Sequence, residues 1–262
     1  MSKEINDAPK PVFQLPEERW EYILAKLHQN QKVISTELSA ELGVSDDTIR
    51  RDLHRLAEDG LIKKVHGGAI PRSAHPLEYR DRLQYAVAEK QVLAKKAQKL
   101  FQNGQILLID GGTTNMELVR QMPDMLEVTV FTNSLPIALE LSAHPQAEVI
   151  FLGGKIFKSS QVAVGPEVIK SLESFRADWC LLGVCSIHPE LGLSVPDREE
   201  ALVKQKMVET ALHTVALATH DKLNTADHYR VCAYNQLDYL LTDDRADDDL
   251  LMPYRGKGVE IC

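Results

Sequence analysis

The chain has 262 residues, a length that suits one large domain or two of ordinary size. Hydrophobic residues make up 44% of it, as in soluble globular proteins, and no apolar run approaches the roughly 20 residues that span a bilayer. The four cysteines lack metal-ligand spacing, and no apolar segment with a cleavage site opens the chain. We therefore expect a cytoplasmic protein with reduced thiols, no metal, no cofactor and no membrane contact.

The formal net charge is −8, which by itself argues against nucleic acid, because backbone phosphates repel an acidic protein. The distribution of charge matters more than its sum. Between positions 50 and 72 basic residues outnumber acidic ones, with Arg50, Arg51, Arg55, Lys63, Lys64 and Arg72 against Asp52, Glu58 and Asp59. A DNA-contacting element is predicted in this basic part of the chain.

Three short helices are predicted after a flexible tail at 1–15. The first covers 17–29 and has its apolar residues along one face, and the second covers 35–42. Gly43 breaks the second helix, since glycine is the usual residue just past a helix C-terminus. Ser45 is a suitable N-cap for the third helix. A helical domain is therefore expected over 16–71.

The third helix has an apolar back and a basic front. Ile49, Leu53 and Leu56 are spaced four and three apart and form the expected buried stripe. A basic, hydrogen-bonding front can enter a major groove, where an arginine either reads a guanine edge or holds a phosphate. The pattern leaves that choice open for each arginine. The DNA-contacting candidates on this helix are Ser45, Asp47, Thr48, Arg50, Arg51, His54 and Arg55.

A wing is predicted after Gly60, which ends the third helix. Residues 61–65 form a short strand and residues 66–69 a turn. Lys63, Lys64 and His66 would then lie along the DNA backbone or in the minor groove. A charged helix alone is usually a solvated face that binds nothing. The helix break at Gly43, the N-cap at Ser45 and the basic wing together favour DNA binding.

The run SDDTIRRDLHRLAEDGLIKKVHGGA at 45–69 closely resembles the winged helix-turn-helix of DeoR-type bacterial transcription regulators. The strings at 48–53 and 66–69 are the most characteristic ones, and Arg19 in the first helix also matches. The resemblance extends from about Pro16 to Asp243. It implies a regulator of sugar or carbohydrate metabolism, usually a repressor, that binds double-stranded operator DNA.

From 90 to 262, after a linker at 72–89 that becomes a helix, short β-rich runs alternate with amphipathic stretches. This alternation is typical of an α/β domain with a mainly parallel sheet. Strands are predicted at 105–110, 128–132, 148–152, 179–184, 214–218 and 239–242. Helices are predicted at 90–101, 115–121, 135–142, 166–171 and 198–211.

Small polar residues follow each of the first three predicted strands. Loops at the carboxyl ends of parallel strands gather at one edge of the sheet, where glycines, hydroxyls and helix N-terminal amides can bind an anion. The first loop leads into a helix and is the favoured phosphate cradle. The ligand-binding candidates in these loops are Asp110, Gly112, Thr113, Thr114, Thr132, Asn133, Ser134, Gly153 and Gly154.

Three charged residues, Glu200, Lys204 and Lys222, complete the candidate ligand site. Spacing alone favours a surface ion pair for Glu200 and Lys204, four apart on a helix. The resemblance implies more: DeoR-type effector domains are similar in fold to ribose-5-phosphate isomerase and usually sense phosphorylated sugars. By that analogy the loop after the first strand holds phosphate, and these three residues face the sugar.

One position departs from the family. Thr219 stands where DeoR-type domains usually have an aspartate, three residues before the final lysine, while Asp221 is adjacent to that lysine and is expected to point elsewhere. Cys185 lies in the stretch after a strand, where it could shape the pocket together with Ser186 and His188, although a buried, inert thiol is favoured. This departure puts either the usual ligand or its usual contacts in question.

Two alternatives to a regulator controlled by a sugar phosphate remain open. An isomerase-like enzyme would use Glu200 as general base and Lys222 to stabilise an oxyanion, but the DNA-binding segment has no role in an enzyme. A ligand-free dimerisation platform is the other. We expect no catalytic residue and a homo-oligomer of at least two chains, because one winged helix buries limited DNA surface.

Overall fold

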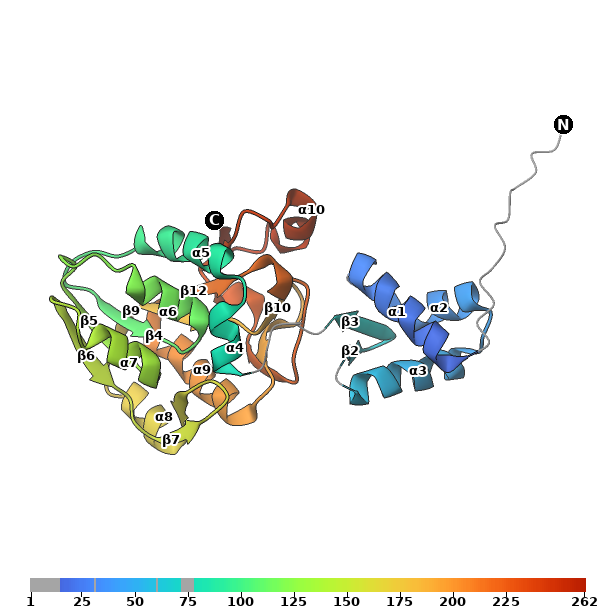
Figure 1. Cartoon of the computed structure of the whole chain (residues 1–262), viewed down its shortest axis with the longest axis horizontal. Helices are drawn as coiled ribbons and strands as arrows, with labels where there is room; N and C mark the ends of the chain where they lie inside the picture. The colour runs from blue at the N-terminus through green and yellow to red at the C-terminus, as the bar shows by residue number, and fades with distance from the viewer. Residues whose placement is uncertain (1–14, 31, 60, 72–77) are drawn as a thin grey trace. The chain divides into compact units, whose positions relative to one another are not determined.

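The computed structural model describes residues 15–30, 32–59, 61–71 and 78–262. The chain divides into two compact units, Met1–Arg72 and Ser73–Cys262, and each has its own hydrophobic core (Figure 1). Most of the predicted tail, the predicted helix end at Gly60 and the first six residues of the predicted linker lie outside the described residues. No helix in the described ranges is long and apolar enough to cross a membrane.

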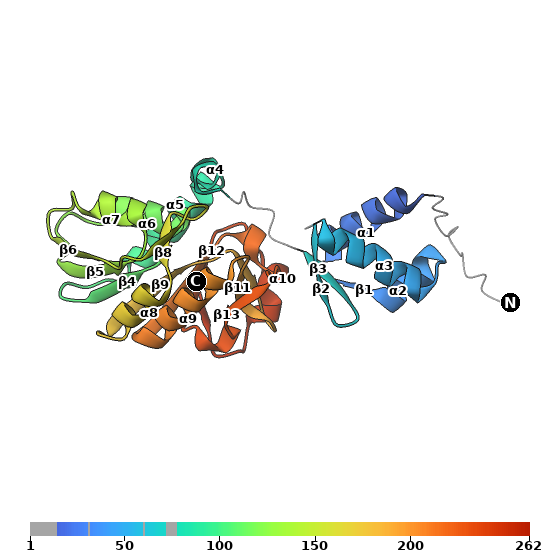
Figure 2. The same cartoon turned by 90° about the horizontal axis from the view of Figure 1, so that it is seen from below.

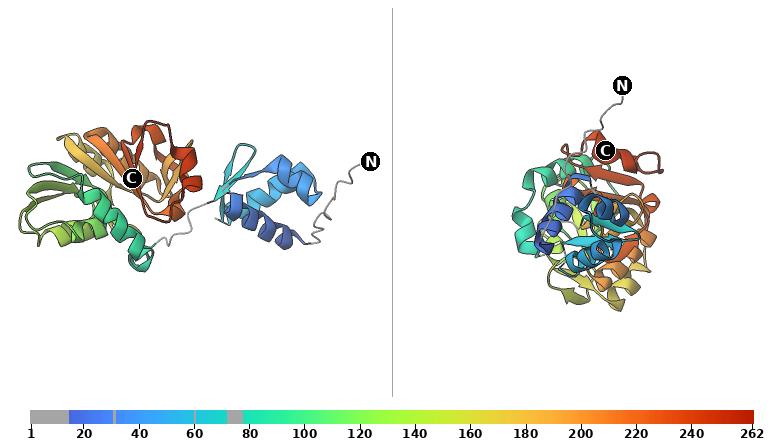
Figure 3. Two further views of the ribbon diagram at one scale, coloured as in Figure 1. Left: turned by 90° about the horizontal axis from the view of Figure 1, so that it is seen from above. Right: turned by 90° about the vertical axis from the view of Figure 1, so that its right-hand side faces the viewer.

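The first unit contains three helices and a small sheet (Figure 3). The helices are α1 (Pro16–Asn30), α2 (Ser35–Leu42) and α3 (Asp46–Glu58), and the strands are β1 (Val33–Ile34), β2 (Ile62–Val65) and β3 (Gly68–Pro71). The strand order is β1-β3-β2 with antiparallel pairing. The unit is therefore a winged helix-turn-helix, and the wing is the β2–β3 hairpin.

Local chemistry explains these boundaries. The Ser45 hydroxyl accepts from the amide of Thr48 at 3.2 Å and caps α3, while Gly43 ends α2 with a φ of 64°. Gly67 forms the hairpin turn with a φ of 78°. A Cβ on Gly68 would lie 1.9 Å from the backbone oxygen of Val33, so only glycine lets β1 approach β3 this closely.

The core of the first unit is formed by the stripe predicted on α3. Ile49, Leu53 and Leu56 are each at most 1% exposed and pack with apolar residues of the other two helices. One charged group joins this packing: Asp52 accepts two hydrogen bonds from the Arg19 guanidinium, at 2.9 and 3.1 Å, and one from the Trp20 indole at 2.8 Å. The bidentate pair ties α1 to α3 and gives a physical role to Arg19.

In the described part of the second unit, seven strands form one parallel sheet in the order β15-β14-β12-β9-β4-β5-β6. The strands are β4 (Ile106–Ile109), β5 (Val128–Thr132), β6 (Ala147–Phe151), β9 (Ala177–Gly183), β12 (Ala211–Ala218), β14 (Tyr239–Thr242) and β15 (Glu260–Ile261). The predicted mainly parallel sheet is confirmed. The strand order reverses between β4 and β9, because the chain builds β5 and β6 on one side of β4 and the later strands on the other.

Helices cover both faces of this sheet (Figure 2). One face carries α5 (Val87–Gln98), α6 (Thr113–Arg120) and α7 (Leu135–Leu141), and the other carries α8 (Pro166–Leu172) and α9 (Arg198–Thr210). The shorter helical segments are η1 (His220–Lys222), η2 (Tyr234–Gln236), α10 (Asp248–Leu251) and η3 (Met252–Tyr254). Burial on both faces explains the continuous apolar runs of β4 and β12.

Several elements were not predicted. The region predicted as a linker contains α4 (Tyr79–Gln84), and α5 begins three residues before the predicted helix start. Two small antiparallel sheets flank the main one: a hairpin of β7 (Lys155–Phe157) and β8 (Val162–Val164), and a sheet of β10 (Ser186–His188), β11 (Gly192–Val195) and β13 (Tyr229–Cys232). These strands have three or four residues, too few for a periodic pattern.

Candidate functional site

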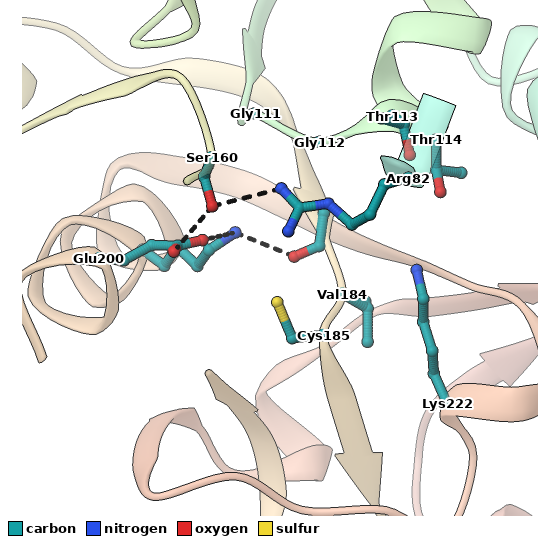
Figure 4. A pocket seen from close by; sticks show the side chains of 12 residues that line it. Arg82, Gly111, Gly112, Thr113, Thr114, Ser160, Val184, Cys185, Glu200 and Lys222 are labelled. Atoms are coloured by element: carbon teal, nitrogen blue, oxygen red, sulfur yellow. Dashed lines mark hydrogen bonds and ion pairs between the residues drawn. The ribbon is translucent and has the colours of Figure 1, made fainter. Parts of the chain in front are cut away.

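A pocket opens at the point where the strand order reverses, beyond the carboxyl ends of β4 and β9 (Figure 4). Its empty volume is about 410 Å³, counting the part that is open to solvent. Such a reversal leaves a crevice between the loops of neighbouring strands, which is where parallel sheets bind ligands. The lining residues are Arg82, Gly111, Gly112, Thr113, Thr114, Ser160, Gly183, Val184, Cys185, Glu200, Lys204 and Lys222.

One wall of the pocket is the N-terminus of α6. Gly112 precedes the helix with a φ of 116°, a conformation that other residues rarely adopt. The first-turn amides of Thr113 and Thr114 have no partner inside the helix, and the hydroxyls of both residues line the pocket. Amides, hydroxyls and the positive end of the helix dipole together form a site for an anion.

Asp110 and Lys204 hold the floor of the pocket together. The Lys204 ammonium donates to the Asp110 carboxylate and, at 2.9 Å, to the backbone oxygen of Gly183. Asp110 also accepts from the amide of Gly183 at 2.9 Å. Burial acts to lower the pKa of Lys204, but the Asp110 and Glu200 carboxylates raise it above its usual value. Lys204 is therefore a permanent cation that lines the pocket, whereas Asp110 lies beneath it.

The Glu200 carboxyl lies above this pair on α9. It is 3.5 Å from the Lys204 ammonium, and the Ser160 hydroxyl donates to it at 3.3 Å. Burial raises the pKa of Glu200, while the Lys204 charge opposes that rise. The prediction from spacing alone, that Glu200 and Lys204 form a surface ion pair, is wrong, because both side chains are at most 8% exposed. The main sheet, α8 and the small sheets enclose this face of α9. The i,i+4 spacing could not predict this burial, because it depends on packing against distant segments.

Two further cations line the pocket, and they come from distant parts of the sequence. Lys222 comes from η1 after β12, and Arg82 comes from α4 (Figure 4). Burial lowers the pKa of Lys222, and the charge of the neighbouring Asp221 opposes that shift. The pocket lining thus contains three cations, Arg82, Lys204 and Lys222, and one carboxylate, Glu200. The pocket is suited to an anionic ligand.

The other two predicted loops do not line this pocket. The hydroxyl of Thr132 accepts from the amide of Ser134 at 3.1 Å, and the Asn133 side chain donates to the backbone oxygen of Ala163 at 2.9 Å. Gly153 and Gly154 lie after β6; a Cβ on Gly154 would be 2.8 Å from the backbone oxygen of Val164. The contacts of these loops join the β7–β8 hairpin to the sheet edge.

Sequence reasoning missed Arg82, Ser160, Gly183 and Val184. Arg82 lies in the region predicted as a linker, and Ser160 lies in the turn of a hairpin that was not predicted, so neither carried a local signal. Gly183 had one: it is the last residue but one of the predicted strand at 179–184, near the carboxyl end where ligands bind, and a Cβ on it would lie 2.2 Å from the backbone oxygen of Gly111.

Three residues that the sequence left in question have clear positions. Burial raises the pKa of the Cys185 thiol to about 12, so it lines the pocket as a neutral group and not as a thiolate. Thr219 is fully buried outside the pocket lining. Asp221 accepts from the Tyr85 hydroxyl at 3.1 Å, away from the lining. No group of three or more potential metal ligands occurs in the described ranges.

The exposed face of α3 carries the predicted DNA-contacting side chains. Each basic one pairs with an acidic neighbour one turn away: Arg50 with Asp46 at 2.8 Å, Arg51 with Asp47 at 3.0 Å, His54 with Glu58 at 3.5 Å and Arg55 with Asp59 at 3.3 Å. These pairs are weak because solvent surrounds them; the Arg51 side chain is 75% exposed. The arginines can exchange these partners for phosphates or bases.

The remaining predicted residues lie at the ends of this face. Ser45 and Thr48 share a 2.8 Å hydrogen bond between their hydroxyls in the α3 cap. Lys64 and His66 are exposed on the β2–β3 hairpin, and Lys63 on β2 is half-buried. The structure thus gathers all ten candidates onto one helix, its cap and the adjoining hairpin of a single unit.

Two family models match the chain. The DeoR-like helix-turn-helix domain matches residues 19–74, and the DeoR C terminal sensor domain matches residues 85–244. The second model alone spans more than half of the chain.

Curated relatives match over most of their length. The HTH-type transcriptional repressor GlcR of Bacillus subtilis is 34% identical, over 87% of this chain and 88% of its own. The HTH-type transcriptional regulator GolR of Listeria innocua is 31% identical, over 94% and 98%. The glycerol-3-phosphate regulon repressor of Haemophilus influenzae is 32% identical, over 86% and 89%.

Solved structures show more distant likenesses. Ribose 5-phosphate isomerase A of Methanocaldococcus jannaschii is 15% identical with a TM-score of 0.38, over 51% of this chain and 52% of its own. The probable sor operon regulator of Shigella flexneri is 10% identical with a TM-score of 0.45, over 67% and 91%. Likenesses at this level concern the fold alone.

Proposed function

Because this chain belongs to the DeoR family of helix-turn-helix transcriptional regulators, we propose that it represses genes of sugar or carbohydrate metabolism under the control of a phosphorylated sugar or polyol. The pocket is the observation that supports control by a phosphorylated ligand. It combines a helix N-terminus with three cations and one carboxylate in its lining, in the same chain as a helix that exposes several arginines. An anion-binding sensor and a DNA-binding unit are the two parts that such control requires.

The phosphate of the ligand sits on the α6 N-terminus in this proposal. The amides and hydroxyls of Thr113 and Thr114 donate to its oxygens, and Lys222 and Arg82 neutralise its charge. The Glu200 carboxylate then accepts hydrogen bonds from sugar hydroxyls, and the Ser160 hydroxyl donates to or accepts from a sugar hydroxyl. Lys204 contributes charge from the floor, and Asp110 acts through Lys204 without touching the ligand.

Operator DNA is bound by the first unit. Arg51 reads a base edge from the middle of the exposed face of α3, flanked by the contacts of Arg50 and Arg55 to phosphates. Lys63 and Lys64 on the wing add phosphate contacts. One unit of this size buries little DNA surface, so we also propose that two or more chains assemble on two half-sites in the cytoplasm.

Absence of turnover is part of this proposal. An isomerase would need Glu200 free to remove a proton from carbon, with a cation placed on the developing oxyanion. In the structure Glu200 faces Lys204 and accepts from Ser160, and Lys204 is already bonded to Asp110. Conversion of ribose 5-phosphate or glucose 6-phosphate by the purified chain would contradict this part of the proposal.

The test uses the full chain and a DNA duplex selected from a random library for binding to it. Operator affinity is measured by fluorescence anisotropy with and without glycerol 3-phosphate, fructose 6-phosphate and glucose 6-phosphate, and with the same compounds lacking phosphate. We expect one phosphorylated compound to change the operator Kd by about 5–150-fold. An operator Kd that no phosphorylated compound changes would contradict control by a sugar phosphate.

A further inference from the structure

The chain enters the second unit through a short segment, residues 78–86, that we call the strap. It consists of Glu78, helix α4, Tyr85 and Ala86, and α5 follows directly. Only residues 72–77 separate it from the end of β3 in the wing. Residues 78–84 also lie between the ranges that the two family models match, 19–74 and 85–244.

One side of the strap is attached to the β7–β8 hairpin. The amide of Tyr79 donates to the backbone oxygen of Ser159 at 2.9 Å, and the Ser159 hydroxyl donates to Glu78 at 3.3 Å. The Arg82 guanidinium lies 3.4 Å from the Ser160 hydroxyl and 3.4 Å from the Ser159 backbone oxygen. Both acceptors are neutral, so a charge-assisted bond from Arg82 to an anion in the pocket would be stronger than either of these two contacts.

The other side of the strap is attached beside Lys222. The Tyr85 hydroxyl donates to the carboxylate of Asp221 at 3.1 Å, one residue before Lys222 in η1. The strap thus joins two walls of the pocket, since Ser160 and Lys222 both line it. A bound anion that draws Arg82 and Lys222 inward would act on both attachments of the strap.

The end of the strap is strained and held by a buried lysine. Ala86 has a φ of 50°, in the left-handed region that costs a non-glycine residue free energy. The Lys90 ammonium donates to the backbone oxygens of Arg82 and Tyr85, which fixes the last turn of α4. A strained junction held by a few specific bonds can change between two arrangements when one bond is strengthened or lost.

We propose that the strap transmits effector binding to the operator-binding unit: the ligand's anion binds Arg82, and the Tyr85–Asp221 bond fixes the strap in the arrangement that this contact favours. The inference rests on the proposed function, since it needs an anion in the pocket. The ligand shifts the strap only by the difference between its affinities for the two arrangements. The Arg82 contact supplies such a difference, and the covalent chain carries it toward the wing.

The experiment separates binding from transmission in the full chain. Tyr85 does not line the pocket, so Tyr85→Phe removes only its hydroxyl bond to Asp221. Tyr229→Phe, at an exposed position on β13, is the matched control. For each protein, calorimetry measures the Kd of glycerol 3-phosphate, fructose 6-phosphate and glucose 6-phosphate, and anisotropy measures the ratio of operator Kd values with and without each compound.

We expect Tyr85→Phe to bind the effective compound with a Kd close to that of the unmodified chain, while its ratio of operator Kd values falls to about two or less. Tyr229→Phe keeps the full ratio. A full ratio in Tyr85→Phe overturns the strap inference alone. Failure of every phosphorylated compound to bind the unmodified chain, or to change its operator Kd, overturns the proposed function and this inference with it.

A second measurement reports on the strap directly. Hydrogen exchange of residues 78–86 is followed in the full chain with and without the effective compound. Exchange should slow on binding in the unmodified chain and slow less in Tyr85→Phe, because the strap then lacks one attachment. Equal slowing in both proteins would also overturn the inference.

Discussion

The Lys204 ammonium donates to the Asp110 carboxylate and to the backbone oxygen of Gly183, so one side chain of α9 joins the loops after β4 and β9. Both ions are almost wholly buried, with side chains 2% and 1% exposed. The desolvation of such a pair is offset only while both partners are present. This bond sets the position of the α6 N-terminus relative to Gly183 and therefore the shape of the pocket.

Breaking this pair should destabilise the second unit strongly. Lys204→Met leaves the Asp110 carboxylate buried without its cation, and we expect a loss of about 3–5 kcal/mol in the free energy of unfolding. Urea denaturation followed by circular dichroism measures it. Lys155→Met is the control, because Lys155 pairs with Glu199 at the exposed surface and should change stability little. Equal effects of the two variants would contradict a structural role for the buried pair.

Removing a phosphate-binding group should weaken the ligand without unfolding the chain. Thr113→Val deletes one hydroxyl, and Lys222→Met deletes one charge-assisted donor, for which we expect a loss of about 1.5–3 kcal/mol in binding free energy. Calorimetry with the effective sugar phosphate measures both. Thr129→Val and Lys170→Met, on β5 and α8 outside the pocket, are the matched controls. Normal binding by both pocket variants would place the ligand elsewhere.

Ligand affinity should fall as the pH rises above 8. Burial, together with the nearby Lys222 and Arg82 charges, lowers the pKa of Lys90 to about 8. A bound anion would raise this pKa, so binding takes up a proton between about pH 8 and the ordinary lysine range, and affinity is highest below pH 8. We expect the Kd to rise by up to about tenfold from pH 7 to pH 9.

Proton uptake can be measured independently of affinity. Calorimetric titrations at pH 8.5 in two buffers with different ionisation enthalpies give the number of protons taken up on binding. Lys90→Met should reduce that number, since it removes a lysine whose pKa of about 8 lies near the pH of the titration. Identical binding enthalpies in the two buffers would show that neither Lys90 nor its neighbours change protonation.

Arg51→Ala should weaken the binding of the selected operator by about 1–3 kcal/mol if Arg51 reads a base. Lys64→Ala should weaken binding to all sequences alike and reduce the salt dependence of the Kd. Anisotropy over a range of salt concentrations distinguishes the two effects. Arg230→Ala, at an exposed position of the second unit, is the control. An unchanged operator Kd in Arg51→Ala, with the fold intact, would remove Arg51 from the recognition surface.

The three predicted polar loops show which part of the site could be predicted from the sequence. It grouped three polar loops at one sheet edge because the carboxyl ends of parallel strands share that edge. Only the loop after β4 lines the pocket. The strand order decides this: β5 and β6 lie on one side of β4, while the reversal that opens the pocket is on the other, beside β9. Strand order depends on contacts between distant segments, and no local pattern encodes it.

Helical and strand periodicity, caps and turn glycines act within a few residues, so the two-part organisation, the winged helix-turn-helix and the parallel sheet could be predicted from the sequence. The polar loop after the first strand predicted Thr113 and Thr114 as ligand candidates, and the family resemblance added Lys222. The bond of Lys204 to Asp110 beneath the ligand space, and the entry of Arg82 into the pocket from α4, became known only from the folded structure. Burial and the pairing of charges across ninety-four residues arise from packing, so they can be read only after the elements have been assembled.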